Sequence, residues 1–332
     1  MNRLWALVIT APFMGACAVP GSPPVSSAGP ADEITDGHPA DVTSRGPGGL
    51  ILAPGEGERL AYCTQPLAVT IKVDSTEAPG TTLVAGTGEL NGVEQAWRHD
   101  ADRVLYVSEG WGLAILGSDT AHVGPGSVLY VPPGAPHRFA SAAGSSLSYF
   151  FVVIPENSAD DFRRAARAGC PDQRVADASG QDGGEPEVVR EAPEIGGVAV
   201  APGEGERISY CVFPLTITSK VDADVAPNAR LTAAHGALRR GTESATHRGD
   251  DEVVIVTHGR GRAFVDPDTV AVEPGSVVFT PRGYRHGFIN DSDDTLEYFI
   301  VFSEPGPREG FRSFARRDGP YCPPPDDPDD RF

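Results

Sequence analysis

An internal repeat constrains the fold of this 332-residue chain more than any other feature of its sequence. The heptapeptide Ala53-Pro-Gly-Glu-Gly-Glu-Arg59 recurs unchanged at residues 201–207, 148 positions further on. The only two lysines, Lys72 and Lys220, keep the same offset. This period is much longer than the roughly 20–50 residues of solenoid repeats, so we expect each copy to be a whole domain with its own core.

The two copies divide the chain into parts of different composition. The segments before, between and after the copies are rich in Pro, Gly, Ser or acidic residues and lack apolar periodicity, which is typical of tethers and linkers. The predicted parts are a signal segment at 1–17, a disordered tether at 18–47, the first copy at 48–170, a linker at 171–195, the second copy at 196–322 and an acidic disordered tail at 323–332.

The chain is strongly acidic, with 46 Asp and Glu residues against 27 Lys and Arg residues and a formal net charge of −19. A chain with this charge repels phosphate groups. We therefore expect a small-molecule ligand or substrate, and neither nucleic acid nor an anionic membrane surface as a partner.

The N-terminal segment has the pattern of an export signal. A short apolar run follows Arg3 and is too short to span a bilayer. The sequence Met14-Gly-Ala-Cys17 is similar to a bacterial lipobox, in which the cysteine carries the lipid anchor. We expect lipidation at Cys17 and an exported, cell-envelope location, with membrane contact only through that anchor. An ordinary signal with a coincidental cysteine is the alternative.

The other four cysteines lie at matching places in the two copies, and four cysteines allow three pairings. A bridge that existed before duplication gives Cys63–Cys170 and Cys211–Cys322, one in each copy. Four free thiols are the alternative, which an oxidising compartment disfavours.

Short β-rich runs separated by Gly/Pro turns dominate both copies, which indicates an all-β sandwich or barrel. We expect one short helix to close each copy, at Ser158–Arg167 and at Glu309–Arg316. The expected strands are 67–73, 103–107, 127–131 and 146–153 in the first copy, and 215–221, 252–257, 276–280 and 296–302 in the second.

Both copies contain a spaced Gly, Pro, Gly and His motif. The second copy has Gly275, Pro281, Gly283, His286 and Asn290, which fits the second cupin motif at every position. The first copy has the same spacing up to its His, with Ser in place of the final Asn. The chain resembles a bicupin, two tandem cupin jelly-roll β-barrels, and within the cupins it resembles small quercetin 2,3-dioxygenase-like proteins.

The resemblance implies a metal site in the second copy. His247, Glu252 and His286 match the second His, the Glu and the last His of the cupin ligand set, whereas Ala245 replaces the first His. Two imidazoles and one carboxylate suit Fe, Mn, Ni or Zn, and Glu252 is the candidate catalytic acid–base. The alternative is that these residues are inherited and no longer bind metal.

The first copy keeps less of this ligand set. With Gly110 aligned to Gly259, Arg103 occupies the Glu position and Arg98 the position of His247, and only His137 persists. Two guanidinium groups oppose a cation, so we expect no metal here. Arg98, Arg103 and His137 are candidates for an anion site, and the alternative is that the arginines pair with internal carboxylates or face solvent.

Three functions stay open from the sequence. The first is a metal-dependent dioxygenase that acts outside the cytoplasm on a small phenolic or other organic substrate. The second is a non-catalytic lipoprotein that binds a small molecule. The third is a structural role, in which the barrels mediate homodimer formation.

Overall fold

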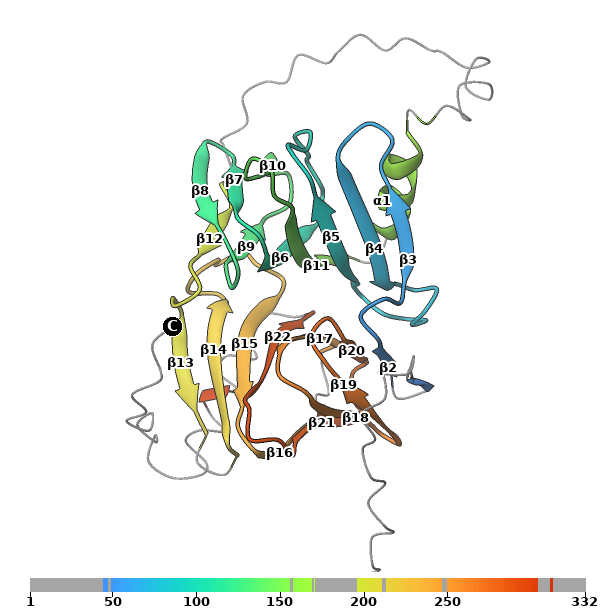
Figure 1. Ribbon diagram of the computed structural model, residues 1–332, viewed down its shortest axis with the longest axis vertical. Coiled ribbons are helices and arrows are strands. Elements are labelled where there is room, and N and C mark those ends of the chain that lie inside the picture. The colour runs from blue at the N-terminus through green and yellow to red at the C-terminus, as the bar shows by residue number, and fades with distance from the viewer. Residues whose placement is uncertain are drawn as a thin grey trace, which may run out of the picture. The chain divides into compact units, whose positions relative to one another are not determined.

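The structure is a computed structural model, which describes residues 44–46, 49–155, 158–168, 170, 196–210, 213–246, 250–303 and 311–312. These residues form β-strands in four antiparallel sheets and one complete helix, α1 (Ser158–Arg167) (Figure 1). The all-β fold and the position of the helix that closes the first copy are therefore as predicted. The second predicted helix is described only at Phe311 and Arg312, which are helical.

Domain 1 consists of a seven-stranded sheet, in the order β12-β9-β6-β11-β5-β4-β3, and a three-stranded sheet, in the order β10-β7-β8. The strands are β3 (Glu58–Ala61), β4 (Leu67–Val73), β5 (Val84–Leu90), β6 (Asp102–Glu109), β7 (Gly112–Leu116), β8 (Asp119–Val123), β9 (Val128–Val131), β10 (His137–Ser141), β11 (Leu147–Ile154) and β12 (Val198–Val200).

Domain 2 consists of an eight-stranded sheet, in the order β1-β2-β20-β17-β22-β15-β14-β13, and a four-stranded sheet, in the order β16-β21-β18-β19. The strands are β1 (Ser44–Gly46), β2 (Gly49–Leu52), β13 (Glu206–Ser209), β14 (Leu215–Val221), β15 (Thr232–Leu238), β16 (Gly241–Thr246), β17 (Glu252–His258), β18 (Gly261–Val265), β19 (Asp268–Val272), β20 (Val277–Thr280), β21 (Arg285–Asn290) and β22 (Leu296–Phe302).

The first strand of each copy pairs with the sheet of the other copy. Strand β2 lies beside β20 of domain 2, and β12 lies beside β9 of domain 1. The prediction that the tether extends to residue 47 is wrong at its end, because Ser44–Gly46 form β1 and pair with β2. Backbone pairing needs no apolar side chain, so the polar composition of this segment did not reveal the strand.

The repeated heptapeptide has a structural role at these crossings. It follows β2 in one copy and β12 in the other, and in each case a buried lysine ammonium holds its carbonyl groups. Nζ of Lys72 donates to the carbonyl oxygens of Ala53, Pro54 and Glu56 at 3.0, 2.7 and 2.8 Å. Lys220 makes the same three contacts in the second copy, which explains why both lysines and both heptapeptides are retained.

Each domain has its own interior core, and a third core contains residues of both copies, including the stacked rings of Tyr106 and Phe299. Helix α1 covers domain 1 beside β3, with Phe162 buried in the core (Figure 1). Within the described residues, no helix has the length and apolar character needed to cross a membrane.

Candidate functional site

Alternation along β6 and β17 decides which side chains enter each domain. In β6, Leu105 and Val107 belong to the interior core of domain 1, whereas Val104 and Tyr106 belong to the core shared by the two copies. Successive side chains of a strand point to opposite faces, so Arg103 points into the domain. The same alternation in β17 places the Glu252 side chain inside domain 2 and that of Asp251 outside it.

The aspartates that precede these two residues lie between the copies. Asp102 is fully buried and accepts hydrogen bonds from Nε of Arg230 at 2.6 Å and from Tyr130 at 2.5 Å. Asp251 accepts from the backbone N–H and the hydroxyl of Thr82, both at 3.1 Å. Asp251 therefore points away from the side chains of Glu252 and His286.

In domain 2, His286 and Glu252 form a buried pair. Nε2 of His286 lies 3.1 Å from Oε2 of Glu252, and Nδ1 lies 3.1 Å from the carbonyl oxygen of Tyr284. Burial lowers the pKa of His286, but the charge and hydrogen bond of Glu252 outweigh it and raise the pKa to about 9. Ala245 pairs with His286 across β16 and β21, as expected of the first ligand position. His247 lies outside the described residues.

In domain 1, Arg103 contacts His137 at the corresponding place. Nη1 of Arg103 lies 3.2 Å from Nε2 of His137, and a guanidinium can only donate, so Nε2 accepts and Nδ1–H donates to the carbonyl oxygen of Ala135. Burial and the charge of Arg103 lower the pKa of His137 to about 3, so the ring is neutral. The lone pair that a metal would need is therefore engaged by a cation.

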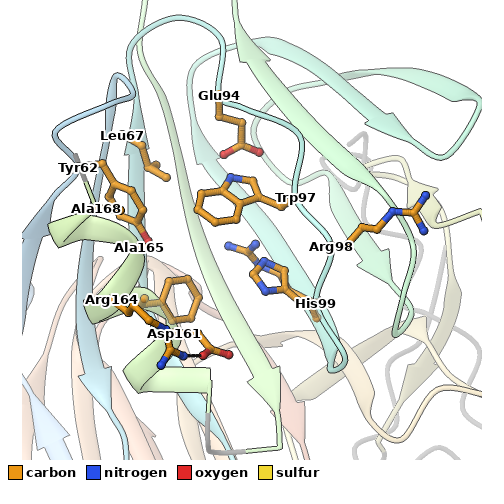
Figure 2. Close-up of a pocket in the computed structure, with 12 residues that line it drawn as sticks. Tyr62, Leu67, Glu94, Trp97, Arg98, His99, Asp161, Arg164, Ala165 and Ala168 are labelled. Atoms are coloured by element: carbon orange, nitrogen blue, oxygen red, sulfur yellow. Dashed lines mark hydrogen bonds and ion pairs between the residues drawn. The ribbon is translucent and has the colours of Figure 1, made fainter. Parts of the chain in front are cut away.

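The assignment of Arg98 to the His247 position is wrong. Trp97 pairs with His137 as Ala245 pairs with His286, so His99, two residues after Trp97, holds the second ligand position. Arg98 is exposed, donates to the carbonyl oxygen of Gly134 and points away from Trp97 and His99 (Figure 2). The first copy has one extra residue between its two bridges to β10, at Val93 and Trp97, which an ungapped alignment could not show.

A cavity of about 280 Å³ in domain 1 lies between the segment that contains Trp97 and His99 and helix α1. Its polar lining consists of Glu94, Arg98, His99, Arg103, Asp161 and Arg164. Tyr62 and Trp97 form aromatic walls (Figure 2), and Phe162 also lines the cavity. Sequence reasoning missed Glu94, although its counterpart by the 149-residue offset, Glu243, is a carboxylate near the second site. Burial raises the pKa of Glu94 to about 7 against the opposing charge of Arg103.

The disulfide Cys63–Cys170 is present, with 5.2 Å between the Cα atoms, and it confirms the pairing predicted for the first copy. Cys63 follows β3 and Cys170 follows α1 in the sequence. Tyr62 and Ala168, which are close to these cysteines in the sequence, both line the cavity. The bridge thus ties one wall of the cavity to the other. Cys17, Cys211 and Cys322 lie outside the described residues, so lipidation and the second bridge stay predictions.

The two sites suit ligands of opposite charge. Glu252 and His286 offer a carboxylate and an imidazole at one point, a donor set that fits a divalent metal. Arg103 offers a cation beside neutral histidines, which opposes a metal, and the absence of metal from domain 1 stays a prediction with this support. Among the described residues, no three His, Cys, Asp or Glu side chains gather as a metal site.

These features define an all-β protein of two repeated two-sheet domains, each with a site on corresponding interior strands. The family described as Cupin domain (Cupin_2) matches residues 85–153 and 235–302. Each copy therefore contains one Cupin domain, which is the arrangement of a bicupin.

Solved structures of oxalate decarboxylase from Bacillus subtilis share the fold. A structure at pH 4.6 is 16% identical in sequence to this chain, and the match covers 76% of each of the two chains with a TM-score of 0.57. A structure from work on the Mn(II) centres is 16% identical and covers 77% of each chain, with a TM-score of 0.57. An oxalate decarboxylase structure that concerns the substrate binding mode is 15% identical, and the match covers 77% of each chain with a TM-score of 0.56. Curated protein sequences give no match.

Proposed function

We propose that the protein is a metal-dependent bicupin enzyme whose domain 2 acts on a small organic molecule that binds through oxygen. The observation that carries this proposal is the buried pair of His286 and Glu252, whose nitrogen and oxygen atoms converge at 3.1 Å. His247 follows β16 in the sequence and would complete a set of two imidazoles and one carboxylate. The Mn(II) centres named for the oxalate decarboxylase structure support a divalent metal in a fold of this kind.

The residues of domain 2 have separable roles in this proposal. A bound Fe, Mn, Ni or Zn ion would supply Lewis-acid or redox chemistry and leave positions open for substrate. The carbonyl oxygen of Tyr284 accepts from Nδ1 of His286 and so fixes the ring with Nε2 toward the site. Glu252 is the candidate group to take the proton of a substrate hydroxyl, as in the resembled dioxygenases.

Metal analysis of the purified full chain tests the proposal. We expect close to one equivalent of Fe, Mn, Ni or Zn when all four are available, and loss of most of it in His286→Ala or Glu252→Gln. His137→Ala in domain 1 is the matched control and should leave the metal content unchanged. Substoichiometric metal in the parent chain, or unchanged metal in His286→Ala, would contradict a metal centre in domain 2. Turnover of flavonols, other phenols or oxalate by the loaded protein then identifies the substrate class.

The proposal includes export and anchoring of the protein through Cys17. The lipobox-like sequence supports the anchor, and the Cys63–Cys170 bridge supports an oxidising compartment. Cys17→Ala should move the protein from the membrane fraction to the soluble exported fraction. An unchanged distribution would contradict lipidation at this residue.

The second candidate is a non-catalytic binding protein. The cavity of domain 1 favours it, because this cavity lies where metal ligands have been replaced. A metal-free protein that still binds a small molecule there would support this function and contradict the first.

A further inference from the structure

The guanidinium of Arg103 is a buried cation that lacks an ion-pair partner. Arg103 is only 5% exposed. Within the described part of the chain, no carboxylate oxygen lies within 4.0 Å of its guanidinium nitrogen atoms. Its stabilising contacts are the hydrogen bond to His137 and the ring faces of Phe151 and Phe162, whose centroids lie 5.5 and 5.6 Å away. An unpaired buried charge is costly, so this arrangement calls for an anion.

Several polar atoms around Arg103 also lack partners. Nε of Arg103, Nε2 of His99 and the hydroxyl of Tyr149 are buried and have no hydrogen-bond partner among the described residues. Buried polar groups are nearly always hydrogen-bonded, and Arg103 and His99 line the cavity, so their orphaned nitrogen atoms point to a ligand. With Nη1 engaged by His137, the edge formed by Nε and Nη2 is the one left to bind a carboxylate with two parallel hydrogen bonds.

Domain 2 shows what the arginine replaces. By the 149-residue offset, Arg103 corresponds to Glu252 and His137 to His286, and each pair lies within 3.2 Å. The exchange of a carboxylate for a guanidinium reverses the charge offered to a ligand at one and the same place in the fold. A site built for a cation in domain 2 is thereby matched by a site for an anion in domain 1.

The walls and size of the cavity define the rest of the ligand. Tyr62, Trp97 and Phe162 line it with aromatic rings, and the rings of Tyr62 and Trp97 meet edge to face at 6.1 Å between centroids. Its volume of about 280 Å³ is just below the roughly 300–1,000 Å³ of pockets for drug-sized ligands, so a single-ring molecule fits. Three arginines line the cavity, but Arg164 is paired with Asp161 and Arg98 is exposed. Arg103 therefore offers the one buried guanidinium among them, which beside the carboxyl group of Glu94 matches one negative charge and not two.

We propose that domain 1 binds a small aromatic monocarboxylate, with its carboxylate on Arg103 and its ring against the wall formed by Tyr62, Trp97 and Phe162. This site is distinct from the metal centre proposed for domain 2 and does not depend on it.

Calorimetric titration of the full chain with benzoate tests the proposal, and benzamide is the neutral control of the same shape. We expect benzoate to bind at least tenfold more tightly than benzamide, and more tightly than acetate, phthalate or inorganic phosphate. This comparison uses the unmodified protein, so it stands even if a variant fails to fold. Equal affinities for benzoate and benzamide, or no benzoate binding at millimolar concentration, would overturn the proposal, and a preference for phthalate or phosphate would overturn the monoanion assignment.

Variants locate the site. Arg103→Gln should weaken benzoate binding at least tenfold, and Arg103→Lys should weaken it less because the positive charge remains. Arg138→Gln, at the exposed arginine next to His137 on β10, and Glu252→Gln, in domain 2, should each change it less than twofold. Loss of binding in Glu252→Gln with retention in Arg103→Gln would place the ligand in domain 2 and overturn the proposal. Removal of metal by a chelator should leave benzoate binding intact, so this site and the metal centre can fail separately.

Discussion

Nη1 of Arg103 lies 3.2 Å from Nε2 of His137 in domain 1, where domain 2 has a carboxylate oxygen of Glu252 at 3.1 Å from the same atom of His286. The contact joins β6 and β10 in domain 1 and the corresponding strands β17 and β21 in domain 2, so the scaffold is the same. The difference in the charge that the two sites offer therefore rests on one residue type, and exchange of that residue should change what the site binds.

Arg103→Glu should create a cation site in domain 1. The variant places a carboxylate beside His137 and His99, a donor set like that of domain 2, and removes the cation that opposes a metal. We expect the metal content of the chain to rise by up to one equivalent, measured by elemental analysis of the purified protein. Arg138→Glu adds the same charge at an exposed arginine on β10, outside the cavity lining, and should leave the metal content unchanged. An unchanged metal content in a folded Arg103→Glu variant would show that the exchange is not sufficient.

Glu94 should make the stability of the protein depend on pH. Its pKa of about 7 in the folded state lies above the ordinary value of 4.5, because burial outweighs the attraction of Arg103. The folded state then binds more protons than the unfolded state between pH 4.5 and 7, so the free energy of unfolding falls as pH rises through this window. Glu94→Gln should remove this dependence and be more stable than the parent at pH 8 by about 2–3 kcal/mol.

Chemical denaturation at pH 5 and pH 8 measures this effect. Glu89→Gln is the control, since Glu89 is exposed and its ion pair with Arg59 is a surface contact. A pH dependence that persists unchanged in Glu94→Gln would assign the effect to other groups.

Carboxylate binding should weaken as pH rises through about 7. A second carboxylate beside Arg103 is repelled once Glu94 is ionised. The other groups near Glu94 do not titrate in this range: burial raises the pKa of Tyr62 to about 12, raises that of Tyr149 further, and lowers that of His99 to about 4. Titration with benzoate at pH 6 and pH 8 should show tighter binding at pH 6, and Glu94→Gln should bind equally at both values.

The sequence predicted the features that depend on local pattern. The repeat, the spaced motif of β20 and β21 and the symmetric cysteines led to the all-β bicupin fold and the Cys63–Cys170 bridge, because each is carried by residues at fixed spacing. The inward position of Arg103 and Glu252 follows from strand alternation, once the strands are known.

The sequence could not predict features that depend on pairing over long distances. The exchange of β2 and β12 between the copies depends on which sheet edge is nearest, and no residue type encodes it. The roles of Arg98 and His99 depend on one extra residue before Trp97, visible only through the bridge from Trp97 to β10. Glu94 was missed because it lies outside the motif, and its match to Glu243 in the second copy does not reveal that it is buried.

Lys72→Met should destabilise the protein by about 2–4 kcal/mol, since it removes the donor for three carbonyl groups at the crossing from β2 to β3. Methionine keeps most of the apolar stem, so the loss reports on the ammonium group. Denaturation in urea measures it, and Lys220→Met should cost a similar amount because its contacts are the same. Arg59→Met, at an exposed ion pair, is the control and should cost less than about 1 kcal/mol. A loss for Lys72→Met no larger than that of the control would mean that the ammonium contacts contribute little.

Replacement of Cys63 and Cys170 by alanine should lower both stability and benzoate affinity. The bridge spans 107 residues of sequence, for which the chain-entropy model gives about 4–5 kcal/mol. It also ties α1, which contributes Phe162 to the cavity, to the segment that carries Tyr62, so its loss should loosen the aromatic wall. Denaturation and benzoate titration of the double variant measure the two effects, and the double replacement of Cys211 and Cys322 should lower stability without weakening benzoate binding.

A non-reduced peptide map that joins Cys63 to Cys211 would contradict the symmetric pairing. An unchanged benzoate affinity in the Cys63 and Cys170 variant would show that α1 holds its place at the cavity without the bridge.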